Sequence, residues 1–187
     1  YLITEQKWIR WLLKGNGQKI LRINKRKFIY LISPNKIYKS FYSDLKNVLK
    51  SNKVSFFQLR LKKATFRQKF IIGKKILKIC KKFKVKFLIN DDVMLVKKLN
   101  ADGCHLGQND TCILEARKFI KNKIIGITCH NSVQLSKSAI KNNADYIALG
   151  AFNLSKTKKI KYRATLNTLK KVKIIANIPI VAIGGIN

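Results

Sequence analysis

Short apolar runs alternate with longer polar stretches along most of this chain. The runs FIYLI, KFLIN, YIALG and IPIVAIGG contain hardly any polar position, which is typical of strands buried on both faces of a parallel sheet. We predict seven strands on this basis, at residues 28–32, 54–60, 85–90, 103–106, 124–128, 146–149 and 178–183.

Between these runs, apolar residues recur at helical spacing. Ile113, Ala116 and Ile120, for example, share one face of a helix. We predict helices at residues 66–83, 92–99, 111–120, 132–142 and 166–176. Strands that alternate with helices, in a chain with only two prolines, indicate βα units and a parallel sheet.

Polar or small residues recur where the predicted strands end, and this favours one kind of parallel sheet. In an α/β barrel, the carboxyl ends of the strands form the rim that carries the chemistry. The residues at this position are Arg60, Asn90, His105, Thr128, Gly150 and Gly184. We therefore expect a (β/α)8 TIM barrel over residues 28–187, truncated after the seventh strand and incomplete at its C-terminus. A doubly wound sheet is the alternative.

Residues 1–27 precede the first predicted strand and are expected to form an N-terminal extension. Trp8, Trp11 and Leu12 share a face at i, i+3, i+4 spacing, which predicts a short amphipathic helix that covers the barrel floor. A basic helix on a membrane surface is the alternative. No run of eighteen apolar residues occurs in the sequence, so we expect no transmembrane helix and no membrane partner.

Composition adds a strong positive charge, with 41 Lys and Arg against 8 Asp and Glu and a net charge of +33. Such a charge can indicate nucleic-acid binding. Because the lysines are spread over the whole chain and no aromatic RNA-binding motif occurs, we expect no specific nucleic-acid partner and favour small phosphorylated substrates. The four cysteines form no CxxC pair, which suggests reduced thiols in a cytoplasmic protein. The sequence does not predict an oligomeric state.

Half of the acidic residues lie within a stretch of twenty, at Asp91, Asp92, Asp102 and Asp110. Asp91 follows the third predicted strand and Asp110 follows the fourth, so neighbouring strands place them at one part of the rim. Two carboxylates with phosphate oxygens and water suit Mg²⁺, and we expect these two residues to be its ligands. The alternative is that each caps a helix. Asp102 is interpreted as a turn residue and Asp92 as helix charge.

Basic and hydroxyl side chains could complete a phosphate site. Gln58, Arg60 and Lys62 alternate along QLRLK and should point the same way, into the barrel mouth. A solvated outer face is the alternative. Further phosphate-binding candidates are Ser155, Thr157 and Lys158 in the loop after the sixth strand, and Gly185 at the end of the seventh. His105 and His130 could line the pocket.

Seven segments of the chain carry a family resemblance. They are, in order, FFQLRLK, FLINDD, ADGCHLGQND, IIGITCHNS, ADYIALGAF, the SKTK loop and IPIVAIGGI. Taken together, these segments resemble the thiamine-phosphate synthase family. The resemblance runs from about Phe28 to Asn187. It implies a (β/α)8 barrel and a transferase that joins hydroxymethylpyrimidine diphosphate to hydroxyethylthiazole phosphate, with Mg²⁺, to yield thiamine phosphate and diphosphate. It also implies a pyrimidine carbocation and no protein nucleophile.

The resemblance implies a role for each matching residue. Asp91 and Asp110 match the Mg²⁺ ligands, and Arg60, Lys62, Thr128 and Lys158 would be catalytic. Substrates would be bound by Gln58, Arg60, Lys62, Asn90, Thr128, Ser155, Thr157, Lys158 and Gly185. Thr128 stands where the family usually has Ser, and the usual prolines are missing from the SKTK loop. Two alternatives remain open: a thiazole tautomerase-like paralogue on the same barrel, and a basic nucleic-acid-binding protein.

Overall fold

The computed structural model describes residues 3–5, 8–13, 19–24, 27–153 and 162–184, with side chains from residue 28 onward. The strands are β1 (Ile3–Glu5), β2 (Trp8–Leu13), β3 (Lys19–Asn24), β4 (Lys27–Ile32), β5 (Val54–Leu59), β6 (Lys86–Asn90), β7 (Gly103–Leu106), β8 (Ile124–His130), β9 (Tyr146–Gly150) and β10 (Ile180–Ile183). The helices are α1 (Phe41–Leu49), α2 (Phe66–Lys82), α3 (Val93–Leu99), α4 (Ile113–Ile120), α5 (Val133–Lys141) and α6 (Leu166–Ile175).

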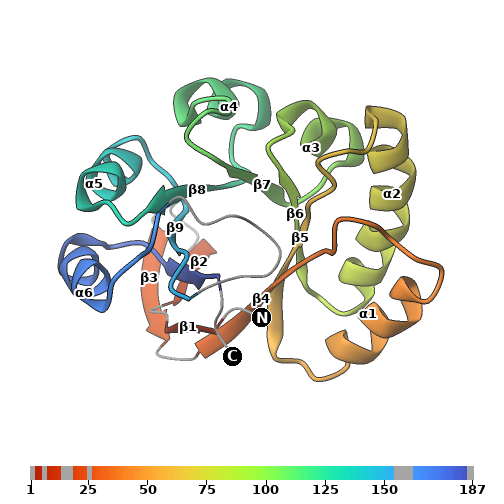
Figure 1. Ribbon diagram of the computed structural model, residues 1–187, viewed down its shortest axis with the longest axis horizontal. Coiled ribbons are helices and arrows are strands. Elements are labelled where there is room, and N and C mark those ends of the chain that lie inside the picture. Colours follow the sequence, from red (N-terminus) through yellow and green to blue (C-terminus); the bar gives the residue numbers. More distant parts are fainter. Residues whose placement is uncertain (1–2, 6–7, 14–18, 25–26, 154–161, 185–187) are drawn as a thin grey trace.

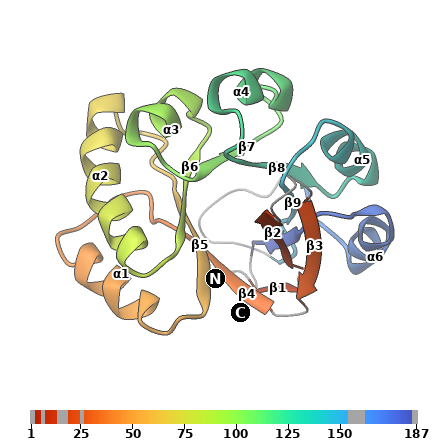
Figure 2. The ribbon, with the colours of Figure 1, turned by 180° about the vertical axis from the view of Figure 1, so that it is seen from behind.

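Seven of these strands, β4 to β10, run parallel and in chain order around a nearly closed barrel. The helices lie outside the ring of strands, as both sides of the molecule show (Figures 1 and 2). All seven predicted strands and all five predicted helices are confirmed within a few residues. The predicted α/β barrel is therefore confirmed. Helix α1 was not predicted.

The N-terminal segment differs from its prediction. Residues Trp8–Leu13 form strand β2 and pair antiparallel with β3, so the predicted amphipathic helix is wrong. The run WIRWLL is rich in aromatic and β-branched residues, and a second mainly apolar run, KILRIN, follows only a few residues later. Two such runs close together favour a hairpin over an isolated short helix. The short strand β1 pairs antiparallel with β4 and also contacts β10.

Two apolar cores hold the barrel together. The larger core lies between the strands and the helices and includes Phe57, Phe87 and Ile125, none of which is exposed. The smaller core fills the barrel interior, where Tyr30, Leu88 and Tyr146 pack together. The glycine at position 126 is required here, because a Cβ atom would lie 1.8 Å from the Tyr146 ring.

The loops that enter β7 and β9 share the sequence Asn-Ala-Asp and the same geometry. In each loop the asparagine adopts a left-handed conformation, at Asn100 and Asn143. The aspartates then accept a backbone hydrogen bond from the neighbouring strand, Asp102 from Phe87 and Asp145 from Ile125. The interpretation of Asp102 as a turn residue is therefore confirmed, and the loop ties adjacent strands together at the floor of the barrel.

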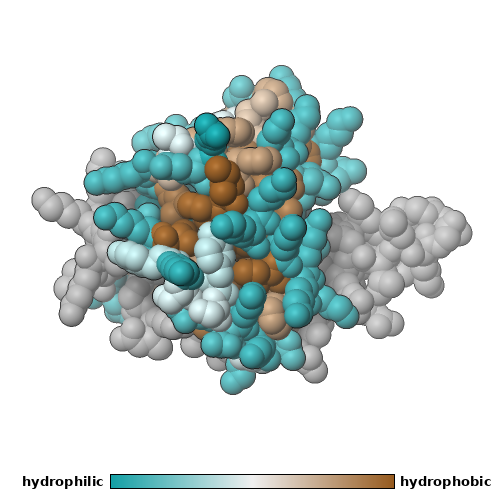
Figure 3. All heavy atoms as spheres, turned by 90° about the vertical axis from the view of Figure 1, so that its right-hand side faces the viewer, coloured by the Kyte–Doolittle hydropathy of each residue, from teal (hydrophilic) through white to brown (hydrophobic). Residues whose placement is uncertain are grey.

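All four cysteines are free, and Cys80, Cys104 and Cys129 are buried, as expected from their spacing. Burial raises the pKa of these three thiols and keeps them protonated. Within the described ranges, no helix is both long enough and apolar enough to cross a bilayer. On the face that carries α1 and α2, hydrophilic side chains surround a group of apolar ones (Figure 3).

Candidate active site at the barrel mouth

The two predicted metal ligands, Asp91 and Asp110, meet at the carboxyl ends of β6 and β7. Asp91 directly follows β6 in a left-handed conformation, with φ of 64°, and its N–H donates to the carbonyl of His105 at 2.8 Å. Asp110 raises the pKa of the Asp91 carboxyl through its negative charge and its hydrogen-bonding capacity, so the two side chains lie close together. The prediction that neighbouring strands bring these residues together is confirmed.

Neither aspartate caps a helix. The N-cap of α3 is Asp92, whose Oδ1 accepts from the backbone N–H of Leu95 at 2.9 Å. The N-cap position of α4 is Cys112, and Asp110 instead accepts from the backbone N–H of Gly107 at 2.6 Å. The structural alternative for Asp91 and Asp110 is therefore excluded, and Asp92 is a cap, not merely a charge in the first turn.

Electrostatics make the pair unusual. Burial, the hydrogen bond with Asp110 and its negative charge raise the pKa of Asp91 to about 6, although Lys62 and Arg60 act in the opposite direction. Two carboxyls in such contact therefore share a proton or require a cation between them. Across the described ranges, no third His, Cys, Asp or Glu joins them in a metal-binding group.

Gln58, Arg60 and Lys62 alternate along the chain at the end of β5. Gln58 points into the barrel and is 2 % exposed. Lys62 Nζ lies 3.8 Å from Asp91 Oδ2, and the Arg60 guanidinium is close enough to affect the charge of both Asp91 and His105. Gln58 therefore points inward as predicted, whereas the Lys62 side chain is 56% exposed and Arg60 Nη1 donates to Asn35 Oδ1 at 3.3 Å.

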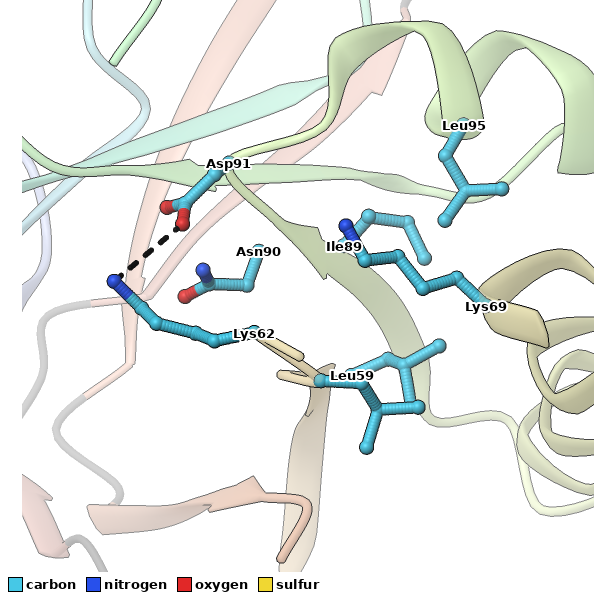
Figure 4. Close-up of a pocket in the computed structure, with 8 residues that line it drawn as sticks. Leu59, Lys62, Lys69, Ile89, Asn90, Asp91 and Leu95 are labelled. Atoms are coloured by element: carbon cyan, nitrogen blue, oxygen red, sulfur yellow. Dashed lines mark ion pairs between the residues drawn. The ribbon is translucent and has the colours of Figure 1, made fainter. Parts of the chain in front are cut away.

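The site opens into a pocket of about 130 Å³ at the ends of β5 and β6. Lys62, Asn90 and Asp91 converge at its mouth, and Lys69 reaches across it from α2 (Figure 4). Lys69 Nζ lies 3.7 Å from Asp92 Oδ2. The rest of the pocket lining is apolar and consists of Leu59, Leu61, Ile89 and Leu95.

A continuous chain of hydrogen bonds crosses the barrel interior and joins Asn90 to Thr128. Gln58 Nε2 donates to Asn90 Oδ1 at 2.6 Å, and Tyr30 donates to Gln58 Oε1 at 3.2 Å. The hydroxyls of Tyr30 and Tyr146 are 2.8 Å apart. His105 links Tyr146 to Thr128 through its two ring nitrogens, each at 2.8 Å.

Burial determines the charge of the side chains in this series of hydrogen bonds. It raises the pKa of both Tyr30 and Tyr146, and it lowers the pKa of His105 to about 4. At neutral pH every member is therefore uncharged. The sequence identified His105 as a pocket candidate but gave no signal for Tyr30 or Tyr146, because a tyrosine in a buried strand is ordinarily a core residue.

Other predicted residues have different outcomes. His130 does not join the chain, and its ring lies 4.5 Å, centroid to centroid, from that of Tyr162. Ser155, Thr157, Lys158 and Gly185 lie outside the described residues, so their predicted roles stay predictions.

Comparisons with known proteins show the family of this chain. The family described as "Thiamine monophosphate synthase" matches residues 29–187. The chain is 66% identical over 166 residues to "Thiamine-phosphate synthase" of Pelagibacter ubique, covering 88% of this chain and 80% of that protein. It is 44% identical over 135 residues to "Thiamine-phosphate synthase" of Nitrosomonas eutropha, covering 72% of this chain and 64% of that protein.

Among solved structures, the chain is similar to "Thiamine phosphate pyrophosphorylase from Pyrococcus furiosus", with a TM-score of 0.75 and 29% identity. That match covers 86% of this chain and 76% of the solved chain. A truncated 3-deoxy-D-arabino-heptulosonate 7-phosphate synthase from Thermotoga maritima, with a TM-score of 0.59 and 14% identity, shares the barrel fold alone.

Proposed function

Because this chain belongs to the thiamine monophosphate synthase family, we propose that it is a transferase that joins hydroxymethylpyrimidine diphosphate to hydroxyethylthiazole phosphate. The products are thiamine phosphate and diphosphate. The observation that carries the proposal is the proximity of the Asp91 and Asp110 carboxyls, with Lys62 Nζ 3.8 Å from Asp91 Oδ2, because this arrangement suits a diphosphate bound with a divalent cation.

The residues fit Mg²⁺. Two adjacent carboxylates repel each other unless a proton or a cation lies between them. Burial, and after it the proximity of Asp110, raises the pKa of Asp91. We propose that Asp91 and Asp110 hold the ion, with substrate oxygens and water as its other ligands. When bound there, Mg²⁺ would neutralise negative charge on the departing diphosphate.

Some side chains at the mouth would then bind the substrate, and others would take part in catalysis. Arg60 and Lys62 would stabilise charge that develops on the diphosphate as its bond to the pyrimidine methylene carbon breaks. Asn90, Gln58 and Thr128 would orient the substrate at the barrel interior. The diphosphate would depart with the electron pair of the C–O bond and leave a carbocation at the pyrimidine methylene carbon. The thiazole nitrogen would form its new bond to this carbon, and no protein nucleophile would take part.

Ser155, Thr157, Lys158 and Gly185 remain proposals from the sequence. Ser155, Thr157 and Gly185 would bind the thiazole phosphate, and Lys158 would bind the diphosphate. Small phosphorylated molecules are therefore the partners we propose. We also propose a cytoplasmic location, which the four free cysteines support.

The test is to incubate the purified protein with both substrates and Mg²⁺ and to measure thiamine phosphate and diphosphate. Asp91→Asn and Asp110→Asn should each remove most of the Mg²⁺-dependent turnover, because each removes a charged ligand. Asp44→Asn is a matched control, since Asp44 is an exposed acid on α1. Wild-type turnover in both site variants would show that the metal assignment is wrong.

A further inference from the structure

The hydrogen-bond chain inside the barrel connects six strands and runs between two parts of the candidate site. It begins at Thr128 on β8 and ends at Asn90 on β6. The three members between Thr128 and Gln58, namely His105, Tyr146 and Tyr30, are all buried. Buried polar side chains that form a continuous series need a consistent donor and acceptor at every step.

The direction of the chain follows from its Gln58 end. Gln58 Nε2 donates to Asn90 Oδ1, so Gln58 Oε1 is the atom that faces Tyr30 and must accept. A tyrosine hydroxyl has one proton, and that of Tyr30 is therefore used on Gln58. The contact of 2.8 Å between Tyr30 and Tyr146 must then use the proton of Tyr146.

The same logic assigns the histidine tautomer. Because Tyr146 donates to Tyr30, it can only accept from His105, and His105 Nδ1 must carry a proton. The ring is buried and uncharged, so its Nε2 has no proton and accepts from the Thr128 hydroxyl at 2.8 Å. Every hydrogen bond from Thr128 to Asn90 thus points the same way.

We propose that Tyr30, Tyr146 and His105 are positioning residues that set the hydrogen-bonding character of both ends of the active site. Thr128 is held as an acceptor, because its only proton is directed inward to His105. Asn90 is held as a donor, because its carbonyl oxygen is occupied by Gln58 and its N–H groups remain for a ligand beside Asp91. The role in catalysis rests on the proposed function, whereas the direction of the chain does not.

The opposite arrangement makes a distinct prediction. If the Gln58 and Asn90 amides were both rotated, every hydrogen bond would reverse, His105 would carry its proton on Nε2, and Thr128 would donate to the substrate. The tautomer of His105 therefore reports the direction of the whole chain.

The first experiment is ¹⁵N NMR of the wild-type protein labelled at histidine, without substrate. The protein has two histidines, so His130→Gln identifies the His105 signals by elimination. We expect His105 to be neutral with its proton on Nδ1. A proton on Nε2, or on both nitrogens at neutral pH, would overturn the proposal, and neither result depends on whether the protein is a synthase.

The second experiment interrupts the chain with Tyr146→Phe, which keeps the ring but removes the acceptor for His105. An N–H without a partner is costly inside a protein, so the proton should move to Nε2 and Thr128 should become a donor. We expect this change of tautomer together with at least a tenfold lower kcat. Tyr30→Phe frees the Tyr146 proton for His105 and should have the same effect, which provides a second variant if the first folds poorly.

Tyr42→Phe is the matched control, because Tyr42 lies on α1 outside the chain. It should leave both the tautomer and kcat unchanged. If the folded Tyr146→Phe and Tyr30→Phe proteins keep the wild-type tautomer and the wild-type kcat, the positioning role is refuted. A changed tautomer with unchanged kcat would refute its part in catalysis and leave the assigned direction intact.

Discussion

Replacement of Asp91 by asparagine should stabilise the metal-free protein while it removes Mg²⁺ dependence. The pKa of Asp91 rises from 3.8 to about 6, chiefly through burial and the proximity of Asp110. The ionised carboxylate is therefore less stable in the folded protein than in the unfolded chain. The asparagine side chain has nearly the same shape without a charge, so the unfavourable interaction would disappear in the variant.

The magnitude follows from the pKa. One pKa unit corresponds to about 1.4 kcal/mol, so a rise from 3.8 to about 6 corresponds to about 3 kcal/mol at most. The Asp91 side chain is 32% exposed, and solvent screening reduces the expected gain to about 1.5 kcal/mol. Because the folded protein binds the extra proton between pH about 4 and about 6, wild-type stability falls as the pH rises through this window.

Urea denaturation in EDTA at several pH values measures this difference. Asp91→Asn should be more stable than wild type at pH 8 and equal to it near pH 4, where the wild-type carboxyl is already protonated. Added Mg²⁺ should then stabilise wild type but not the variant. The reasoning is refuted if the variant gains nothing at pH 8, or if its gain is the same at both pH values. Asp44→Asn should show no such gain.

Three further substitutions test the barrel interior, the barrel floor and the site. Gly126→Ala would place a Cβ atom 1.8 Å from the Tyr146 ring. We therefore expect a displaced tyrosine and a free energy of unfolding lower by about 2 kcal/mol in denaturation experiments, and unchanged stability would contradict this. Arg117→Met removes donors to three backbone carbonyls and a carboxylate, and should cost about 2 kcal/mol with KM unchanged. Lys62→Met should raise KM for the pyrimidine diphosphate about tenfold, equivalent to ~1.4 kcal/mol, whereas Lys63→Met should not.

The barrel could be predicted because its strands are short, continuously apolar and separated by polar helices. Helix α1 was missed although Phe41, Leu45 and Leu49 have helical spacing, because the segment is short and Ser40 makes no side-chain cap. The spacing of Trp8, Trp11 and Leu12 fits a helix equally well in isolation. Only the pairing with β3 decides it, and pairing is not a local property of the sequence.

The candidate site could be predicted in part for a similar reason. Asp91 and Asp110 each follow a strand, and neighbouring strands of a barrel bring such residues together. The contact between Tyr30 and Tyr146 joins residues 116 positions apart, and both resemble ordinary core tyrosines in the sequence. Their role becomes visible only when the hydrogen bonds of His105 are followed from one strand to the next.

The central claim is that Asp91 and Asp110 hold a cation that helps to bind a diphosphate. Calorimetric titration of the pyrimidine diphosphate into the protein, with and without Mg²⁺, tests it most directly, since binding is measured before any reaction. We predict at least about tenfold tighter binding with Mg²⁺ in wild type, equivalent to ~1.4 kcal/mol, and no effect of Mg²⁺ in the variant with both Asp91→Asn and Asp110→Asn. The same Mg²⁺ effect in that double variant would contradict the claim.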